Sequence, residues 1–149
     1  MFGPHRWHGK FRGCGCRLTL PRETVLNILN RTDKHLSVDE VFAVVNRSYP
    51  GIGIATIYRT LDLLSRMGLV SKFEFGDGKS RYELAESKKG HHHHLVCNGC
   101  GRIIDYSDFI NKEVKFVSEL EKELAEKHKF KINSHQIHFY GICKECTNK

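Results

Sequence analysis

Apolar residues recur every three or four positions through the first half of the chain, which is the pattern of amphipathic helices. The pattern predicts three helices. The first follows Pro21, the second begins at Ser37 and the third runs from about Ile54 to Met67. Ser37 and Glu40 have the spacing of a capping box, in which two residues at a helix start satisfy each other's backbone N–H groups. We therefore expect three packed helices in this part of the chain.

Beyond the third helix the hydrophobic period becomes alternating. Residues 69–75 and 80–84 are short strand-like runs, and residues 76–79 between them are suited to a hairpin turn. Three helices followed by a hairpin predict a winged helix-turn-helix, whose last helix enters the DNA major groove. The alternative is a small helical domain that binds protein. Tyr58 and Arg59 near the front of the third helix favour DNA. Basic residues also lie on the hairpin, namely Lys72, Lys79 and Arg81.

The second half of the chain predicts a small sheet with one long helix across it. Residues 91–97 and 102–106 are strand-like, and residues 130–143 return as a further strand. Residues 108–128 place Phe109 and other apolar residues on one side of a helix and lysines and glutamates on the other. We expect this domain to dimerise, because DNA readers of this type are usually two-fold dimers.

These patterns predict an α+β protein with two domains. Residues 1–84 form a winged helix-turn-helix domain, in which residues 1–16 are a glycine-rich, basic arm that we expect to be flexible. The polar segment 85–90 is the expected hinge, and residues 91–149 form a small α/β dimerisation domain that binds metal. No apolar run approaches about 18 residues, so we expect a cytoplasmic protein without a membrane span.

The formal net charge is +7, and most of the excess positive charge lies in residues 1–84. A basic domain favours an anionic partner, most often nucleic acid. Six cysteines in a cytoplasmic protein favour metal binding over disulfides. A zinc hydrolase is the enzyme to consider, but the chain has no His-Glu-x-x-His or similar set. We therefore do not expect an enzyme.

The segment GHHHHLVCNGCG at residues 90–101 combines imidazoles and thiolates, which are ligands of zinc and other late first-row metals. A second Cys-x-x-Cys lies near the end of the sequence. Two such pairs supply the four ligands of a tetrahedral ion. The sequence therefore predicts a structural zinc on Cys97, Cys100, Cys143 and Cys146.

The histidine run has a further consequence if it forms a strand. Side chains alternate between the faces of a strand, so His92 and His94 point one way and His91 and His93 the other. One strand then supplies two metal sites; a solvated polar linker is the alternative. In the arm, Cys14 and Cys16 with nearby histidines are compatible with metal binding, but we interpret them as incidental exposed residues.

Five longer motifs resemble the ferric uptake regulator family of bacterial metal-dependent repressors, over residues 17–146. They are RLTLPR, GIATIYRTLDLL, GDGKSRYEL, HHHHLVCNGCGRIID and YGICKEC. The resemblance implies a winged helix, an α/β dimerisation domain and a homodimer on a palindromic operator in double-stranded DNA. It also implies that the four cysteines hold the family's structural zinc.

The resemblance further implies roles for single residues. A regulatory metal site matches five residues of this chain, namely His35, Glu83, His92, His94 and Asp105. A third site of some members matches His91, His93 and His135, although His93 stands where aspartate is usual. Lys112 falls near the helix position that often supplies a glutamate to that site. The family's DNA contacts match Arg17, Tyr58 and Arg59, with Arg17 in the minor groove.

On this basis we expect a metal-responsive repressor of metal uptake or homeostasis genes, with the ion as corepressor. Mixed imidazole and carboxylate ligands suit Fe²⁺, Mn²⁺ and Zn²⁺ alike. Asp105 resembles the peroxide-sensing branch, whereas Arg59 after Tyr58 resembles the iron- and zinc-sensing branches. We expect iron; a zinc-uptake or peroxide-stress regulator of the same family is the alternative, and a metal storage or chaperone protein is a different class.

Overall fold

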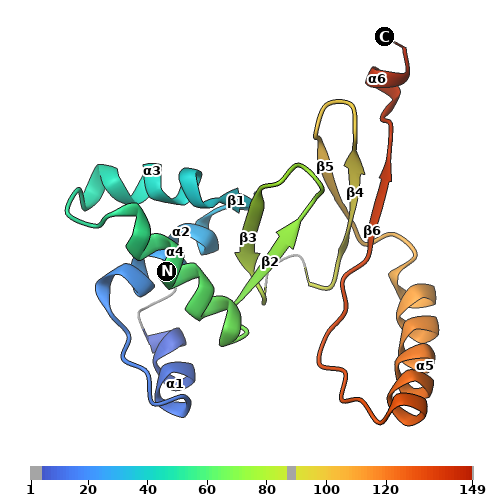
Figure 1. Cartoon of the computed structure of the whole chain (residues 1–149), viewed down its shortest axis with the longest axis horizontal. Helices are drawn as coiled ribbons and strands as arrows, with labels where there is room; N and C mark the ends of the chain where they lie inside the picture. Colours follow the sequence, from blue (N-terminus) through green and yellow to red (C-terminus); the bar gives the residue numbers. More distant parts are fainter. Residues whose placement is uncertain (1–4, 87–89, 149) are drawn as a thin grey trace. The chain divides into compact units, whose positions relative to one another are not determined.

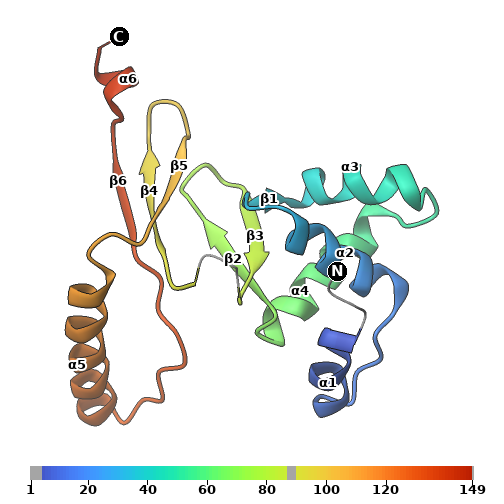
Figure 2. The same cartoon turned by 180° about the vertical axis from the view of Figure 1, so that it is seen from behind.

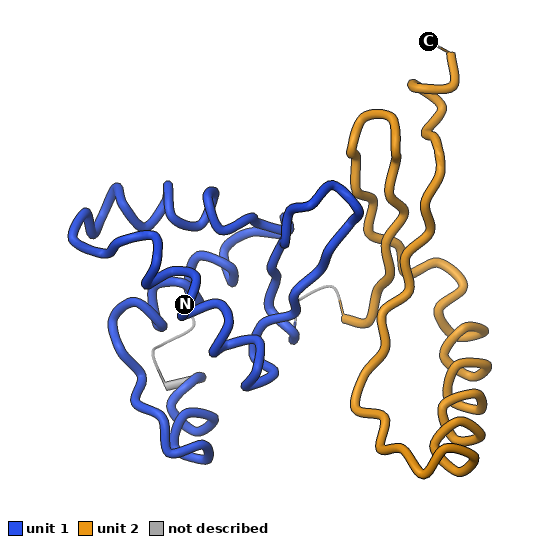
Figure 3. The backbone as a smooth tube through the Cα atoms, in the orientation of Figure 1, with its two compact units in different colours: residues 1–88 blue, residues 89–149 orange. Residues whose placement is uncertain are grey.

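The computed structural model describes residues 5–86 and 90–148, which form two compact units (Figure 3). Unit 1 spans residues 1–88 and unit 2 spans residues 89–149. The division falls in the segment 85–90 that the sequence predicts as a hinge, of which residues 87–89 lie outside the described part. Each unit has its own three-stranded sheet, with strand orders β1-β3-β2 and β5-β4-β6 (Figure 1).

Unit 1 contains the three predicted helices, α2 (Leu20–Arg31), α3 (Val38–Ser48) and α4 (Ile54–Arg66). The capping box at the start of α3 is present, with Ser37 and Glu40 each accepting the other's backbone N–H. The apolar faces of the helices form the unit's core, which includes the fully buried Val25, Leu26, Val41, Ile57 and Leu61. Helical periodicity therefore predicted these elements correctly.

The wing is a hairpin of β2 (Val70–Glu74) and β3 (Ser80–Leu84), paired antiparallel from Val70 opposite Leu84 to Glu74 opposite Ser80. Gly76 and Gly78 have φ angles of +84° and +74°, which only glycine adopts without strain, and they make the turn possible. A two-residue strand, β1 (Leu36–Ser37), adds to the other edge of β3. Sequence patterns did not predict β1 because two residues have no measurable period.

The expectation of a flexible arm at residues 1–16 is wrong for residues 5–13. This segment forms α1 (His5–Gly13), and Trp7 and Phe11 are only 5% and 2% exposed within the core of unit 1. The two aromatic residues are four positions apart, so they lie on the same face of a helix. Their burial offsets the entropy of ordering a glycine-rich segment. Residues 1–4 lie outside the described part.

In unit 2 the central strand is β4 (His93–Cys97), antiparallel to β5 (Ile103–Tyr106) and parallel to β6 (His138–Gly141). The expected strand over residues 130–143 is therefore much shorter in the structure. The chain continues into a short C-terminal helix, α6 (Lys144–Thr147), which the patterns did not predict. Figure 2 shows β4 between its two neighbours from the opposite side.

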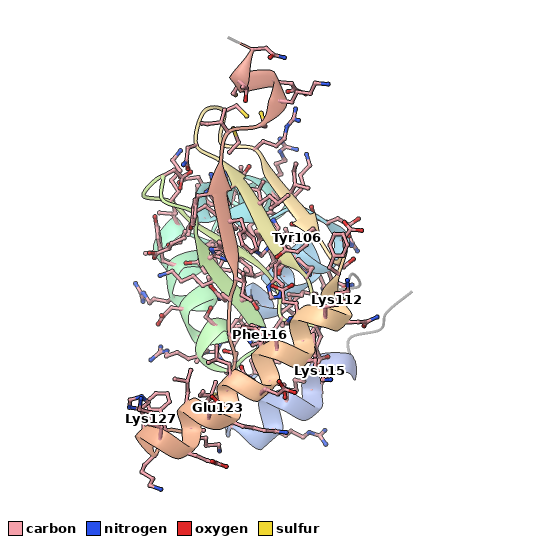
Figure 4. All side chains as sticks on the ribbon, turned by 90° about the vertical axis from the view of Figure 1, so that its right-hand side faces the viewer. Tyr106, Lys112, Lys115, Phe116, Glu123 and Lys127 are labelled. Atoms are coloured by element: carbon pink, nitrogen blue, oxygen red, sulfur yellow. The ribbon has the colours of Figure 1, made fainter. Side chains whose placement is uncertain are left out.

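The long helix of unit 2 is α5 (Ile110–His128). It starts two residues later than expected, because Phe109 has a left-handed backbone (φ 63°) and is 78% exposed. Figure 4 shows Lys112, Phe116 and Lys127 among the labelled residues along the helix. None of the residues of α5 is fully buried within the chain, and its apolar positions remain partly exposed. In the described ranges, no helix has the length and apolar character needed to cross a membrane.

Candidate metal centres and DNA-binding surface

Four cysteine thiols come together in unit 2. Cys97 ends β4, Cys100 lies in the following turn, Cys143 is the N-cap of α6 and Cys146 lies within that helix. Their Sγ atoms all lie within 4.8 Å of one another, and none forms a disulfide. Four thiolates at this spacing suit a tetrahedral zinc ion.

Within this cluster, the surroundings of Cys97 favour the thiolate form that binds a metal. The backbone N–H of Cys143 donates to Cys97 Sγ at 3.2 Å. This bond and a second one from the backbone N–H of Cys100 lower the pKa of Cys97 to about 6. Cys146 behaves differently, because hydrogen bonds with the other thiols, of which the one with Cys143 has the largest effect, raise its pKa to about 12. A Cβ at Gly99 would lie 3.0 Å from both Cβ and Sγ of Cys146. Glycine is therefore required where the backbone passes close to a ligand.

The histidine run alternates between two sides, as strand geometry requires. The ring centroids of His92 and His94 are 5.2 Å apart, and those of His91 and His93 are 4.7 Å apart. His93 and His94 are each only 2% exposed. β4 and the two residues before it therefore supply one histidine pair to each of two different clusters.

The first cluster is built by strand register. His94 pairs with Asp105 on β5 and with His138 on β6, and its Nε2 lies 3.7 Å from Asp105 Oδ1. The ligand atoms of His92, His94 and Asp105 lie within 4.8 Å of one another. The rings of His94 and His138 are 5.2 Å apart. His138 is not among the predicted ligands, because its position beside His94 depends on the parallel pairing of β4 with β6.

Unit 1 contains a separate imidazole–carboxylate pair. The antiparallel register of β1 and β3 continues outward to place His35 opposite Glu83. His35 Nε2 lies 3.2 Å from Glu83 Oε2, and the two side chains are 6% and 14% exposed. The rings of Phe73 and Phe75 pack edge-on against His35 at 5.4 and 5.8 Å. Two of the five predicted regulatory ligands therefore lie together within this unit.

A third cluster lies in unit 2. The ligand atoms of His91, His93 and His135 lie within 4.8 Å of one another. Burial lowers the pKa of His93, which keeps the imidazole in the neutral form that binds metals. Glu113 Oε2 is 3.5 Å from His93 Nε2, a neighbour that sequence analysis missed. Glu113 lies in the first turn of α5, one position after Lys112, which falls near the position that often supplies a glutamate in the family.

The predicted DNA contacts are exposed on unit 1. Tyr58, 54% exposed, and Arg59 lie on α4, beside a groove of about 530 Å³ that separates this helix from the wing. Lys72 and Lys79 of the wing line the same groove. Arg17 is exposed ahead of α2, and its carbonyl accepts a hydrogen bond from Arg22. An exposed helix beside basic wing residues is the surface with which winged helices bind duplex DNA.

Arg81, one of the basic residues on the hairpin, is paired within the wing itself. Its guanidinium makes two hydrogen bonds to the carboxylate of Asp77, at 2.6 and 3.1 Å, and lies over the ring of Phe75 at 5.8 Å from the centroid. Asp77 also accepts the backbone N–H of Lys79 at 3.1 Å. Arg81 therefore stabilises the turn of the wing, and Lys79 remains the exposed cation at its tip.

The Asp77 interactions predict a pH dependence of stability. They lower the pKa of Asp77 from 3.8 to about 2, first through the Arg81 hydrogen bond. A carboxyl group whose pKa is lower in the folded state stabilises the fold above its unfolded pKa and loses this effect as the pH falls. We expect Asp77→Asn to be less stable than wild type at pH 7, with the difference shrinking from about pH 4 towards pH 2. The difference in unfolding free energy is measured by urea unfolding, monitored through the fluorescence of Trp7, the only tryptophan, which is buried. A difference unchanged between pH 5 and pH 3 would contradict this expectation.

A winged helix with an exposed aromatic–arginine pair, on the same chain as three clusters of metal-binding side chains, defines a metal-dependent DNA-binding protein. Residues 13–140 match the model of the ferric uptake regulator family. The chain belongs to this family, whose members are metal-responsive transcriptional repressors.

Known members are similar over nearly the whole chain. The ferric uptake regulation protein of Bacillus subtilis is 41% identical over 135 residues, which are 89% of this chain and 87% of that protein. The peroxide-responsive repressor PerR of Staphylococcus aureus is 30% identical over 138 residues, which are 93% and 87% of the two chains. The structure of the Helicobacter pylori ferric uptake regulator, which has three functional metal-binding sites, is similar with a TM-score of 0.72 and 28% identity, covering 95% and 89%.

Proposed function

We propose that this protein represses metal-uptake genes as a homodimer on a palindromic operator, with Fe²⁺ as corepressor. The main support is that, within each unit, part of the predicted ligand set is already brought together. His35 and Glu83 are paired in unit 1, and His92, His94 and Asp105 converge in unit 2. An ion bound by all five residues would link the DNA-binding unit to the dimerisation unit.

This ligand set gives the metal control over DNA binding. The two recognition helices of a dimer must reach successive major grooves, about 34–36 Å apart. An ion that needs ligands from both units binds only the arrangement that brings them together, so its differential affinity is large. A shift from 1:99 to 99:1 in favour of that arrangement takes about 5.5 kcal/mol. Metal availability would thereby set occupancy of the operator.

Iron is the metal we favour among those that the ligands accept. Nitrogen and carboxylate donors do not by themselves choose between Fe²⁺, Mn²⁺ and Zn²⁺. The greater identity to the Bacillus ferric uptake regulation protein, 41% against 30% for the Staphylococcus peroxide-responsive repressor, favours iron. Asp105 keeps peroxide sensing as one alternative to be tested, and Arg59 after Tyr58 keeps zinc sensing as another.

The decisive experiment measures DNA binding under each ion. Operator fragments are selected from a genomic library with metal-loaded protein. Mobility shifts are then compared for stripped protein and for protein with Fe²⁺, Mn²⁺ or Zn²⁺, without oxygen. We expect retardation only with metal, and with Fe²⁺ at the lowest free concentration. Equal binding by stripped and loaded protein excludes the proposal. Loss of binding after brief peroxide exposure identifies the peroxide-responsive alternative, and no retardation under any condition favours metal storage.

Exposed apolar residues of unit 2 support the homodimer. Val114, Leu120 and Leu124 on α5 are 40–46% exposed, and Ile104 and Phe139 on the sheet are 44% and 53% exposed. Apolar surfaces of this kind are usually covered by another protein. A second copy of the chain is the partner we infer, since family members are dimeric regulators. We further infer a non-catalytic role in the cytoplasm.

The third cluster is proposed as an additional metal site with Glu113 as a further ligand. His93 and His135 each have a buried Nε2 without a hydrogen-bond partner among the described residues. His135 Nδ1 lies 2.8 Å from Glu121 Oε1, a bond that orients the ring and leaves Nε2 for an ion. Glu113 would take the place of the glutamate that the family pattern puts near Lys112.

The DNA contacts lead to a prediction for Arg59→Ala. We expect it to weaken binding by about 1 to 3 kcal/mol at the contacted base pair while sparing nonspecific affinity, because arginine contacts to base edges carry sequence information. Fluorescence anisotropy with operator and scrambled duplexes measures both quantities. Arg66→Ala is the matched control, since Arg66 lies at the far end of α4 and pairs with Asp62 at 2.9 Å. Equal losses of affinity for both duplexes would indicate that Arg59 contacts phosphate and not a base edge.

A further inference from the structure

The turn that ends α1 fixes the backbone around two cysteines of unit 1, Cys14 and Cys16. The N–H of Cys16 donates to the carbonyl of Phe11 at 3.1 Å, and the N–H of Gly15 donates to the carbonyl of Arg12 at 3.2 Å. Gly15 has a φ angle of +67°. These two bonds and the left-handed glycine form a Schellman motif, so the spacing of the two cysteines is set by a defined turn.

Both thiols are directed by this turn. Cys14 Sγ donates to the carbonyl of Phe11 at 3.3 Å, and Cys16 Sγ donates to the carbonyl of Cys14 at 3.6 Å. Interaction with the Cys14 thiol, together with burial, raises the pKa of Cys16. Cys16 packs partly buried against the core, whereas Cys14 is exposed. The pair therefore has one anchored sulfur and one that can rotate towards a ligand.

The anchoring of α1 changes the interpretation of these cysteines. On a flexible arm they would be incidental, as the glycine-rich sequence suggested. Trp7 and Phe11 are instead buried in the core, so the turn belongs to the folded unit. The entropic cost of bringing two thiols together is then met by folding and not by the ligand.

We propose that Cys14 and Cys16 form a binding site for a soft, two-coordinate metal cation, of which Cu⁺ fits best. Thiolate ligands select Cu⁺ and zinc, but a structural zinc needs four ligands. Among the side chains that the structure describes, those of residues 7–86 and 90–148, no third His, Cys, Asp or Glu ligand atom forms a cluster with these two sulfurs. Two thiolates are sufficient for Cu⁺ and insufficient for zinc.

The charge around the turn suits the complex. Binding breaks two S–H bonds, releases two protons to solvent and forms two Cu–S bonds, while copper stays Cu⁺. The product carries a net charge of −1. The sequence places Arg12 and Arg17 on either side of the pair, and their positive charges offset the charge of an anionic complex.

A copper titration of the zinc-loaded, full-length protein tests the site. Cu⁺ is kept reduced with ascorbate under anaerobic conditions, and bicinchoninate serves as the competing chelator. Wild type should bind about one more Cu⁺ per chain than the Cys14→Ser/Cys16→Ser double variant. Each single serine variant should lower the affinity more than about 100-fold, since the loss even of an outer-shell partner costs 10- to 100-fold.

Thiol mapping locates the bound ion independently. In Cu⁺-loaded wild type, Cys14 and Cys16 should both be protected from iodoacetamide while zinc stays bound to the protein. Equal copper uptake by wild type and the double variant, with release of zinc, would assign the copper to the four-cysteine cluster and overturn the proposal. A Cys14–Cys16 disulfide that persists in reduced glutathione would do the same, because an oxidised pair has no thiolate to offer.

Discussion

Exchanging Cys97 for serine is expected to unfold unit 2 and to abolish the dimer while unit 1 stays folded. Cys97 is 6% exposed, and its Sγ accepts the N–H of Cys143 within the four-cysteine cluster. A serine hydroxyl is a hard, weakly acidic donor that does not replace a thiolate on zinc. Structural zinc contributes directly to folding free energy, about 10–16 kcal/mol in small zinc-binding peptides. We therefore expect zinc loss and a fall in Tm of at least about 10 °C for this unit.

Three measurements distinguish loss of the structural zinc site from misfolding of the whole chain. Zinc content and sedimentation report on unit 2 and the dimer. Fluorescence of Trp7, the only tryptophan and part of the unit 1 core, reports on the other unit and should be unchanged. Cys14→Ser is the matched control, since it removes a thiol from unit 1 and should leave zinc and dimer intact. A Cys97→Ser protein with native zinc content, Tm and oligomeric state would show that the cluster is not a structural site.

Replacing either His92 or Glu83 with alanine is expected to give a folded, zinc-containing dimer that no longer responds to the regulatory metal. The two residues lie in different units, and each belongs to one pre-arranged part of the proposed ligand set. Losing one ligand weakens the ion's preference for the DNA-binding arrangement. We expect the metal-dependent gain in operator affinity to fall at least about 10- to 100-fold, the range measured when metal ligands lose even their supporting partners.

The comparison of these two variants tests whether both units contribute ligands to one ion. Operator affinity is measured by anisotropy with and without Fe²⁺ and compared with wild type. His128→Ala is the matched control, because it removes an exposed imidazole in the last turn of α5, away from the clusters. Full metal response in both Glu83→Ala and His35→Ala together with loss in His92→Ala would mean that unit 1 supplies no ligand, and the proposed coupling would fail.

Local patterns were sufficient for the elements whose signals lie within a few residues. Helical periodicity predicted α2, α3 and α4, and the spacing of Ser37 and Glu40 predicted the capping box that the structure contains. Strand alternation separated His92 and His94 from His91 and His93. Each of these predictions depends on the geometry of one turn or one strand, which sequence spacing determines.

Errors arose where the outcome depended on contacts distant in sequence. Residues 5–13 are glycine-rich and carry few apolar positions, so only the core available to Trp7 and Phe11 makes them a helix. Glu113, one position after Lys112, lies beside His93, a contact between residues far apart in sequence. Local propensity has no information on either contact.

The sequence by itself determined the helices of the winged domain, the residue types of the metal clusters and the face on which each histidine lies. Only the tertiary structure decided that His35 meets Glu83 across β1 and β3, that His138 lies beside His94, and that Cys14 and Cys16 sit on an ordered turn. The reason is physical: spacing along the chain sets the direction of a side chain, whereas its neighbours are set by strand register and burial between segments far apart in sequence.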